Sequence, residues 1–584
     1  MSLTAKPSFT YRHLVLTYLR PQWQRALMML MLLFLSIGLQ LANPQILRQF
    51  IDNALNDAAT SALIYAGVLY VGLSFANQLL AVWNTYVSEN LAWTATNQLR
   101  TDLVLHCLHL DMAFHKARTS GELIERIDGD VNTLSTFFSQ AVVQLFGNSL
   151  LIIGVLLLLF REEWRIGLAI SLFAAVGLFI LIRLRNVAVP RWVKAREKDA
   201  EFFGFLGEHL AGTEDLRANG ATGYVMSRFH QLLRDWLPLQ FRAHFVGFVT
   251  WSSTLLLFGL GNVLALGISA YFWSNKSITL GTVYLIFYYT NLLSAPLQQI
   301  RTQLQQLQEA SAGIERIKKL LQSTPTIVDG DGPQLPTGPL TVEIKDLSFG
   351  YNQDEPILHH MNIRLEAGRV LGILGRTGSG KTTLTRLLLR LYDIQDGEML
   401  VGGVPIKRTR IRDLRQHISM VTQEVQLFHA TVRDNLTYFD RSIKDEQILA
   451  VLEEIELFRW YQSLPDGLDT MLGSDGEGLS AGEAQLLAFT RVFLLNPGLV
   501  IMDEASSRLD PTTEKLIERA IDKLLVERTG IVIAHRLATI HRADDILVLE
   551  DGCILEYGPR EQLASDPTSH FYQLLQTGLE EVLT

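Results

Sequence analysis

The sequence predicts an all-α membrane domain of six helices followed by a cytosolic α/β domain. The first observation is a set of long apolar runs confined to the first 300 residues of the 584-residue chain. The second is a segment rich in proline and glycine, TPTIVDGDGPQLPTGP at 324–339, which is typical of a domain boundary. The third is the alternation of short β-rich runs with helical runs beyond that segment, which is typical of an α/β domain.

Composition supports a membrane part and argues against several other classes of protein. Hydrophobic residues make up 48% of the chain and the mean hydropathy is +0.18, which is high for a soluble protein. The net charge of -9 gives no basic footprint, so we expect no nucleic-acid partner. Cys107 and Cys553 are far apart and form no CxxC pair, so neither a disulfide framework nor a cysteine metal site is indicated.

Six apolar runs are long enough to span a bilayer. A hydrocarbon core of about 30 Å needs roughly 20 residues of helix at about 1.5 Å per residue. The runs cover residues 26–46, 62–87, 141–160, 166–182, 246–273 and 280–297. Only five residues separate the third run from the fourth, so we expect a tight hairpin there.

The distribution of basic residues predicts the topology. Lys6, Arg12, Arg20 and Arg25 precede the first run, and three arginines follow the fourth, so the positive-inside rule places the N-terminus in the cytoplasm. Two long internal segments result, at 88–140 and 183–245. We expect helices that extend beyond the bilayer, because structureless loops of that length are uncommon.

The span interiors lack Asp, Glu, Lys and Arg, which usually mark ion or proton paths within a membrane. A neutral or amphipathic cargo is therefore favoured over proton-coupled transport. Uncharged polar residues remain in the spans, and most are expected to make hydrogen bonds between helices, while some could line a pathway. These residues are Gln40, Asn77, Gln78, Asn84, Asn262 and Asn291.

A predicted phosphate-binding loop lies near the start of the α/β domain. The strand-like run 370–374 leads into Gly375-Arg376-Thr377-Gly378-Ser379-Gly380-Lys381-Thr382 and then into an apolar helix, which is GxxxxGK[ST] in its required context. Glycines let backbone N–H groups surround phosphates, Lys381 reaches the β and γ groups, and Thr382 ligates Mg²⁺. Thr383 either bonds a phosphate or packs the helix.

An acidic pair ends a second strand-like run. Asp503 and Glu504 follow the apolar residues 499–502, at the end of a strand where parallel sheets bind nucleotides. Asp503 is expected to hold Mg²⁺ through water, and Glu504 to polarise the attacking water. His535 follows another apparent strand, 531–534, and is interpreted as the γ-phosphate sensor. The cofactors expected here are ATP and Mg²⁺.

The run from Leu479 to Asp510 resembles, in order and spacing, the signature motif, Walker B and D-loop of ATP-binding cassette (ABC) exporters. The resemblance covers nearly the whole chain and implies a P-loop ATPase domain. It matches Tyr351 to the aromatic that stacks on adenine and Gln423 to the glutamine that contacts Mg²⁺. It matches Ser480 and Gly482 to residues that contact ATP on the opposite subunit, and Asp510 to the aspartate at that interface.

The resemblance also implies domain roles. Residues 1–305 correspond to a transmembrane domain, 306–339 to a helical extension and linker, and 340–584 to a nucleotide-binding domain. Breaks in the helical pattern at 113–131 and 207–221 lie where exporters of this family have coupling helices. A chain of half size implies a dimer with a second half-transporter, embedded in the bacterial inner membrane with its nucleotide-binding domain in the cytoplasm.

The signature departs from the usual LSGGQ, because this chain has Leu479-Ser480-Ala481-Gly482-Glu483. In one interpretation, the carboxylate of Glu483 repels the triphosphate, at a cost of about 2 kcal/mol for an effective dielectric of ~20 and a separation of ~8 Å. In the other, Ser480 and Glu483 form a capping box. The resemblance implies that one ATP site is often degenerate in heterodimers of this family, so Glu504 retained beside an altered signature favours a heterodimer, with a homodimer as the alternative.

We therefore expect an ATPase-coupled translocase, which exports a small-molecule, lipid or peptide substrate from one side of the membrane to the other. The alternative is an ATP-gated channel or a regulatory ABC subunit, in which the same motifs gate a pathway without pumping. A soluble ABC ATPase acting on nucleic acid is disfavoured by the six spans and the acidic charge balance.

Overall fold

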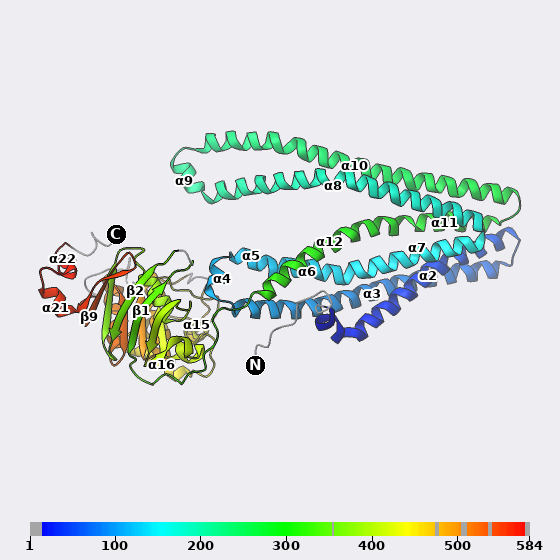
Figure 1. Cartoon of the computed structure of the whole chain (residues 1–584). Helices are drawn as coiled ribbons and strands as arrows, with labels where there is room; N and C mark the ends of the chain where they lie inside the picture. The colour runs from blue at the N-terminus through cyan, green and yellow to red at the C-terminus, as the bar shows by residue number, and fades with distance from the viewer. Residues whose placement is uncertain (1–14, 353–354, 474–477, 504–510, 535–539, 578–584) are drawn as a thin grey trace. The chain divides into compact units, whose positions relative to one another are not determined.

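The computed structural model describes residues 15–352, 355–473, 478–503, 511–534 and 540–577, and it divides into two compact units. The first unit contains Met1–Leu108 and Ser120–Ser323 and is helical. The second contains His109–Thr119 and Thr324–Thr584 and holds all the described strands. Figure 1 shows the long helices of the first unit and the sheets of the second.

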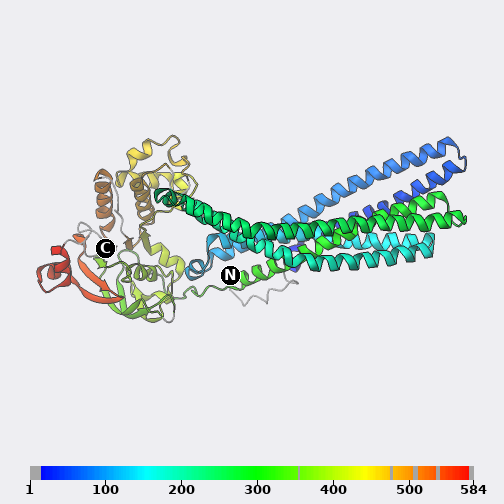
Figure 2. The same ribbon diagram turned by 90° about the horizontal axis from the view of Figure 1, so that it is seen from above.

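The helical unit is built from antiparallel pairs of long helices. The helices α2 and α3 pair with each other, and α8 pairs with α10, as two views show (Figures 1 and 2). The main helices are α2 (Trp23–Leu55), α3 (Thr60–Leu108), α7 (Val142–Glu162), α8 (Trp164–Ala211), α10 (Thr222–Ser274), α11 (Leu280–Leu292) and α12 (Ser294–Gln322). Shorter elements precede α2 and join α3 to α7: η1 (Val15–Leu19), η2 (Arg20–Gln22), α4 (Met112–Lys116), α5 (Ser120–Ile124), η3 (Glu125–Gly129), α6 (Asp130–Thr136) and η4 (Phe137–Ala141).

Five stretches of helix among the described residues are long and apolar enough to cross a membrane. They are Leu16–Leu55, Thr60–Leu108, Ser120–Glu162, Trp164–Ala211 and Thr222–Ser274. The sixth predicted run, 280–297, is divided between α11 and α12. Pro296 has no N–H to donate to the carbonyl of Leu292, so regular helix is interrupted at Leu293, although Leu297 N still donates to Leu293 O at 3.3 Å.

The long helices extend far beyond a bilayer core, as predicted. The lengths of α3, α8 and α10 are 49, 48 and 53 residues. At about 1.5 Å per residue each is ~70–80 Å long, more than twice the ~30 Å of hydrocarbon. The predicted helix breaks are present: α4 and α5 lie in one of them, and α9 (Thr213–Ala218) lies in the other.

Two hydrogen bonds between polar side chains join helices in the spans, and they involve three of the predicted positions. Ser36 Oγ of α2 donates to Asn77 Oδ1 of α3 at 2.9 Å, and Asn262 Nδ2 of α10 donates to Asn291 Oδ1 of α11 at 2.9 Å. Gln40 instead donates to Ser36 Oγ on its own helix at 3.2 Å. Hydrogen bonding between helices therefore explains Asn77, Asn262 and Asn291 without a cargo contact.

The second unit contains two sheets. The four-stranded antiparallel sheet has the order β2-β1-β4-β5, with β1 (Val342–Phe349), β2 (Leu358–Leu365), β4 (Asp396–Val401) and β5 (Val404–Pro405). The six-stranded sheet has the order β10-β9-β3-β8-β7-β6 and is parallel except for β10. Its strands are β3 (Val370–Gly375), β6 (Ile418–Val421), β7 (Leu499–Asp503), β8 (Thr529–Ile533), β9 (Asp545–Glu550) and β10 (Cys553–Pro559).

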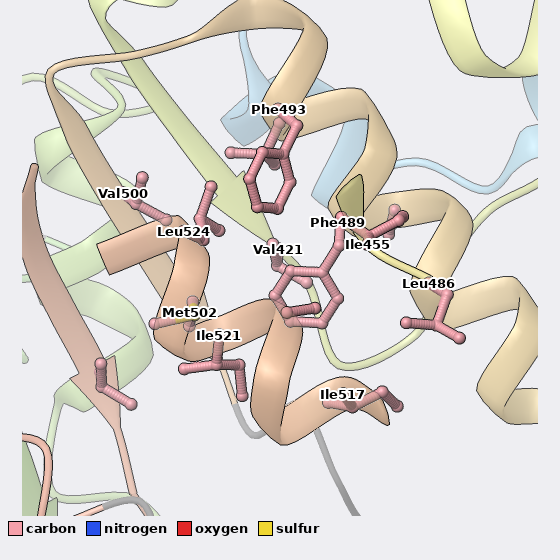
Figure 3. Close-up of a cluster of buried hydrophobic side chains, with 14 of the residues drawn as sticks. Val421, Ile455, Leu486, Phe489, Phe493, Val500, Met502, Ile517, Ile521 and Leu524 are labelled. Atoms are coloured by element: carbon pink, nitrogen blue, oxygen red, sulfur yellow. The ribbon is translucent and has the colours of Figure 1, made fainter. Parts of the chain in front are cut away.

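The parallel strands are buried on both faces, so their residues alternate between two hydrophobic cores. Leu499 and Ile501 join the core shared with the antiparallel sheet and α13, whereas Val500 and Met502 face the second core. Figure 3 shows that second core, with Phe489 and Phe493 of α18 beside side chains of α19. Burial of each such side chain stabilises the fold by about 1.5–3 kcal/mol.

The helices of the second unit are mostly short. Those described in residues 324–584 are α13 (Lys381–Leu388), α14 (Ile411–His417), α15 (Val432–Thr437), α16 (Asp445–Glu454), α17 (Phe458–Gln462), α18 (Ala481–Leu495), α19 (Pro511–Leu525), α21 (Arg560–Ser565) and α22 (His570–Thr577). Two single turns, η5 (Ile406–Arg408) and η6 (Gly467–Asp469), complete the described elements.

Candidate nucleotide site

Three parallel strands bring the predicted site residues to one edge of the sheet. The strand β3 ends at Gly375, where the phosphate-binding loop begins, and β7 ends at Asp503. The strand β6 ends at Val421, two residues before Gln423. Because β3, β8, β7 and β6 are neighbours in that order and run parallel, their carboxyl ends share the edge at which such sheets bind ligands.

The phosphate-binding loop adopts a backbone that only glycine tolerates well. Gly378 has φ 90° and Gly380 has φ 101°, both in the left-handed region. A Cβ on Gly380 would also meet Leu358 Cδ2 at 2.5 Å. No side chain caps the first turn of α13, and that turn contains no acidic residue. Its amide groups are therefore available to an anion.

Lys381 lies buried inside this loop, with 6% of its surface exposed. Its Nζ donates to the carbonyl oxygens of Gly375 at 2.5 Å and Arg376 at 2.9 Å, so the ammonium is held at the centre of the turn. Ser379 Oγ is buried without a hydrogen-bond partner among the described residues, and Ser379 is 3% exposed. A buried hydroxyl of this kind is satisfied when an anion accepts a hydrogen bond from it, so the loop fits a phosphate.

The two threonines after Lys381 differ in environment. Thr383 is 7% exposed and its Oγ1 lies 3.3 Å from the hydroxyl of Tyr351, which favours the packing interpretation for this residue. Thr382 is only partly buried, on the first turn of α13. Its hydroxyl, the carboxylate of Asp503 and the amide oxygen of Gln423 are oxygen donors at the same edge, which is the chemistry that Mg²⁺ prefers. These three residues would hold the metal, which neutralises phosphate charge when bound.

Tyr351 follows β1 and is fixed at its hydroxyl end. Arg386 Nη1 of α13 donates to the Tyr351 hydroxyl at 3.2 Å. The rings of Phe349 and Tyr392 stand nearly perpendicular to the Tyr351 ring, with centroids 5.4 and 4.9 Å away. Burial in this aromatic corner raises the pKa of Tyr392. The ring predicted to stack on adenine is therefore attached to the same helix as the phosphate-binding loop.

The altered signature forms a complete capping box at the start of α18. Ser480 Oγ accepts a hydrogen bond from Glu483 N at 3.2 Å, and Glu483 Oε2 accepts from Ser480 N at 2.8 Å. The Ser480 hydroxyl also donates to Glu483 Oε2 at 2.8 Å. Gly482 lies in the first turn of the same helix. The structure therefore contains the hydrogen bonds of a capping box between Ser480 and Glu483. The Glu483 carboxylate also lies beside the Ser480 hydroxyl, which the family resemblance assigns to contact with phosphate.

Sequence reasoning missed Arg491, a buried arginine on α18. Its Nε donates to Asn435 O at 2.8 Å, and its Nη1 donates to Gln426 O at 3.1 Å, three residues beyond Gln423. Burial lowers the pKa of the guanidinium, which also lies over the ring of Tyr438. The sequence does contain one sign of this residue, because Arg491 is the only charged residue in the apolar run 486–495. Glu504, Asp510 and His535 lie outside the described residues.

This combination defines a membrane protein that binds nucleoside triphosphate at a P-loop. Family models assign both halves: "ABC transporter transmembrane region" matches residues 26–297, and "ABC transporter" matches residues 358–507. The chain belongs to the ABC transporter family and is an ATPase-coupled transmembrane transporter with half-transporter architecture.

Relatives match along most of the chain. A fatty acid ABC transporter ATP-binding/permease protein of Mycobacterium bovis is 30% identical over 485 residues, 83% of this chain and 77% of that protein. An ATP-dependent lipid A-core flippase of Alcanivorax borkumensis is 27% identical over 564 residues, 95% of each chain. The solved structure of a bacterial Atm1-family ABC exporter with ATP bound shares the fold, with a TM-score of 0.78 and 23% identity, over 95% of this chain and 98% of that one.

Proposed function

We propose that this chain is one half of a dimeric exporter that uses ATP hydrolysis to move an amphipathic, lipid-like cargo. The observation that carries the proposal is the shared sheet edge where Lys381, Asp503 and Gln423 meet, in a chain whose spans contain no charged interior residue. Relatives described as a lipid A-core flippase and a fatty acid transporter support the lipid class. Uncharged spans support it as well, because an amphipathic molecule needs no charged path.

Each site residue has a proposed role. Lys381 and the amides of the first turn of α13 bind the β and γ phosphates. Glu504 polarises the attacking water, and His535 contacts the γ-phosphate. Gln423 follows β6 at the metal edge, so it is suited to report the presence of nucleotide. Hydrolysis then depends on charge stabilisation by groups that are already in place before the reaction.

We further propose that the partner is a different half-transporter. Ser480, Gly482 and Asp510 would face the ATP held by the opposite subunit. In this chain the Ser480 hydroxyl donates to Glu483, and the carboxylate adds negative charge where phosphate would approach. The ATP site to which this chain contributes its signature would therefore bind ATP weakly. The site with Glu504 would be completed by a partner whose signature lacks the acid.

Topology and domain roles follow from the same proposal. The N-terminus and the nucleotide-binding domain (340–584) lie in the cytoplasm, and the membrane domain (1–305) lies in the bacterial inner membrane. Residues 306–339 join them. The segments that contain the short helices α4 and α9 couple the nucleotide-binding domain to the membrane domain. Each lies at the end of a helix that is too long for the bilayer, so it projects from the membrane.

The test is uphill transport in proteoliposomes containing the complex of the two half-transporters. Glu504→Gln should keep ATP binding and abolish ATP-driven movement of a fluorescent phospholipid between leaflets. Glu446→Gln, on the exposed start of α16, is the matched control and should behave as the unmodified chain. Unchanged uphill transport in Glu504→Gln would refute the catalytic role.

The partner proposal has a separate test. The chain purified alone should form few ATP-closed dimers and should hydrolyse ATP slowly until a second half-transporter is added. A homodimer that turns over ATP at two equivalent sites would refute the heterodimer. Movement of a water-soluble dye at a rate equal to that of the phospholipid would refute the lipid class of the cargo.

A further inference from the structure

A lysine from the membrane half of the sequence lies over the ring assigned to adenine. The segment His109–Thr119, between α3 and α5, packs with Thr324–Thr584 as part of one compact unit. Within that unit, Lys116 Nζ lies 4.2 Å from the centroid of the Tyr351 ring. This is cation–π geometry, in which the ammonium sits on a face of the ring.

The segment that carries Lys116 is attached to the second unit independently of this contact. Asp111 precedes α4, and its Oδ2 accepts a hydrogen bond from Thr326 Oγ1 at 2.7 Å and another from Thr326 N. At the other end of α4, the guanidinium of Arg118 lies 4.1 Å from the ring centroid of Phe114. The Arg118–Phe114 contact is internal to the segment and stiffens it, while the Asp111–Thr326 hydrogen bonds attach it to residues 324–584, so the position of the lysine does not depend on Tyr351 alone.

The Tyr351 ring is also held in place. Its hydroxyl is bonded to Arg386 and lies near Thr383, and the rings of Phe349 and Tyr392 are perpendicular to it. The atoms of a base stacked on such a ring lie about 3.5–4.0 Å from the ring atoms, the optimal separation of carbon atoms in contact. An ammonium 4.2 Å from the centroid fills that volume, so a base and Lys116 cannot occupy the same face together.

We propose that Lys116 competes with the adenine of ATP for the face of Tyr351. This inference rests on the proposed adenine role of Tyr351. The base displaces the ammonium when ATP binds, and segment 109–119 loses one of its contacts with residues 324–584 of the same unit. Because the same segment continues in the sequence into α3 and α5, it reports base occupancy to the membrane helices. Lys116 is therefore a residue that sets nucleotide affinity and responds to the base, separately from the phosphates.

The test compares two ligands on the purified full chain without Mg²⁺, so that nothing is hydrolysed. Lys116→Met keeps the apolar stem and removes the charge. It should tighten ATP binding by roughly 2–5-fold, the equivalent of one exposed cation–π contact. It should leave the affinity for inorganic tripolyphosphate unchanged, because that ligand has no base. Lys345→Met, which removes an exposed lysine paired with Glu343, is the matched control and should change neither affinity.

Other outcomes overturn the proposal. Unchanged or weaker ATP binding by Lys116→Met excludes competition, and equal tightening of both ligands assigns the effect to charge near the phosphates. A Tyr351→Ala arm separates this inference from the adenine assignment. Tyr351→Ala should weaken ATP binding and should cancel the effect of Lys116→Met. If Tyr351→Ala leaves ATP binding unchanged, the adenine role itself fails. If the lysine effect persists in Tyr351→Ala, only the competition fails.

Discussion

Two helices of the second unit begin after glycine-containing turns, yet their N-termini are arranged differently. At α13 the preceding residue is Gly380, which has no side chain, and the first residue is Lys381. At α18 the preceding residue is Ser480, which exchanges hydrogen bonds with Glu483. Both helices present a positive dipole end. The comparison shows that side chains decide whether that end binds an external anion or is satisfied within the protein.

The difference extends to the cost of each arrangement. The α13 turn needs a left-handed Gly380 close to Leu358, and it buries a lysine and a Ser379 hydroxyl that finds no partner in the described part of the chain. Such features destabilise the turn until a phosphate binds. The α18 turn contains favourable hydrogen bonds and a carboxylate that complements the dipole. The first turn is therefore built for a ligand, and the second is stable without one.

The largest expected effect is at the first turn. Lys381→Ala should lower ATP turnover by about 10²–10³-fold, since it removes the charged donor that stabilises developing phosphate charge. The measurement is phosphate release by the assembled transporter at saturating ATP. Lys407→Ala, in the short turn η5, is the control and should keep full turnover. Turnover within threefold of the unmodified chain would show that α13 does not hold the reacting phosphates.

The second prediction concerns charge at α18. Glu483→Gln keeps a side chain that can accept the hydrogen bond of Ser480 N, but it removes the negative charge. ATP-dependent closure of the dimer should tighten by about 10–30-fold, corresponding to removal of ~2 kcal/mol of repulsion. The measurement is a titration with ATP, in which cross-linking between cysteines introduced on the two sides of the interface reports the fraction of closed dimers at each concentration. An unchanged ATP concentration at half-maximal closure would mean that the charge of Glu483 does not weaken ATP-dependent closure. A homodimer would then be supported.

The contrast between the turns also separates what the sequence predicts from what it does not. The start of α13 at Lys381 and the end of β7 at Asp503 follow from local patterns, because glycine spacing and apolar runs dictate backbone conformation within a few residues. The capping box of Ser480 and Glu483 is local as well. Its pattern was visible in the sequence, but the sequence could not decide between a cap and phosphate repulsion.

Contacts between distant segments were not predictable. Arg491 bonds the carbonyls of Gln426 and Asn435, and Lys116 lies over Tyr351, although no short pattern connects these positions. Such contacts depend on the path of the whole chain. The run 280–297 illustrates a milder case, since hydropathy indicates one span while Pro296 divides it into α11 and α12.

The third prediction tests whether α18 is held from its middle as well as its start. Arg491→Leu leaves the buried carbonyl of Asn435 and the carbonyl of the exposed residue Gln426 without the charged donor that binds both, at a cost of about 2–4 kcal/mol in the free energy of unfolding. The melting temperature of the nucleotide-binding half should fall by roughly 5–15 °C. Calorimetry of the purified chain measures the shift. Arg412→Leu, exposed on α14, should change it by less than about 2 °C.

The smallest expected effect is loss of the cap itself. Ser480→Ala removes the side chain that accepts from Glu483 N, so α18 should lose about 1 kcal/mol and the melting temperature should fall by roughly 2–4 °C. Ser480→Thr keeps an equivalent hydroxyl and should restore most of the loss. The effect should also shrink in Glu483→Ala, because both residues belong to one capping box. A fall of the same size in both backgrounds would show that the two side chains act independently, and α18 would then differ from α13 by charge alone.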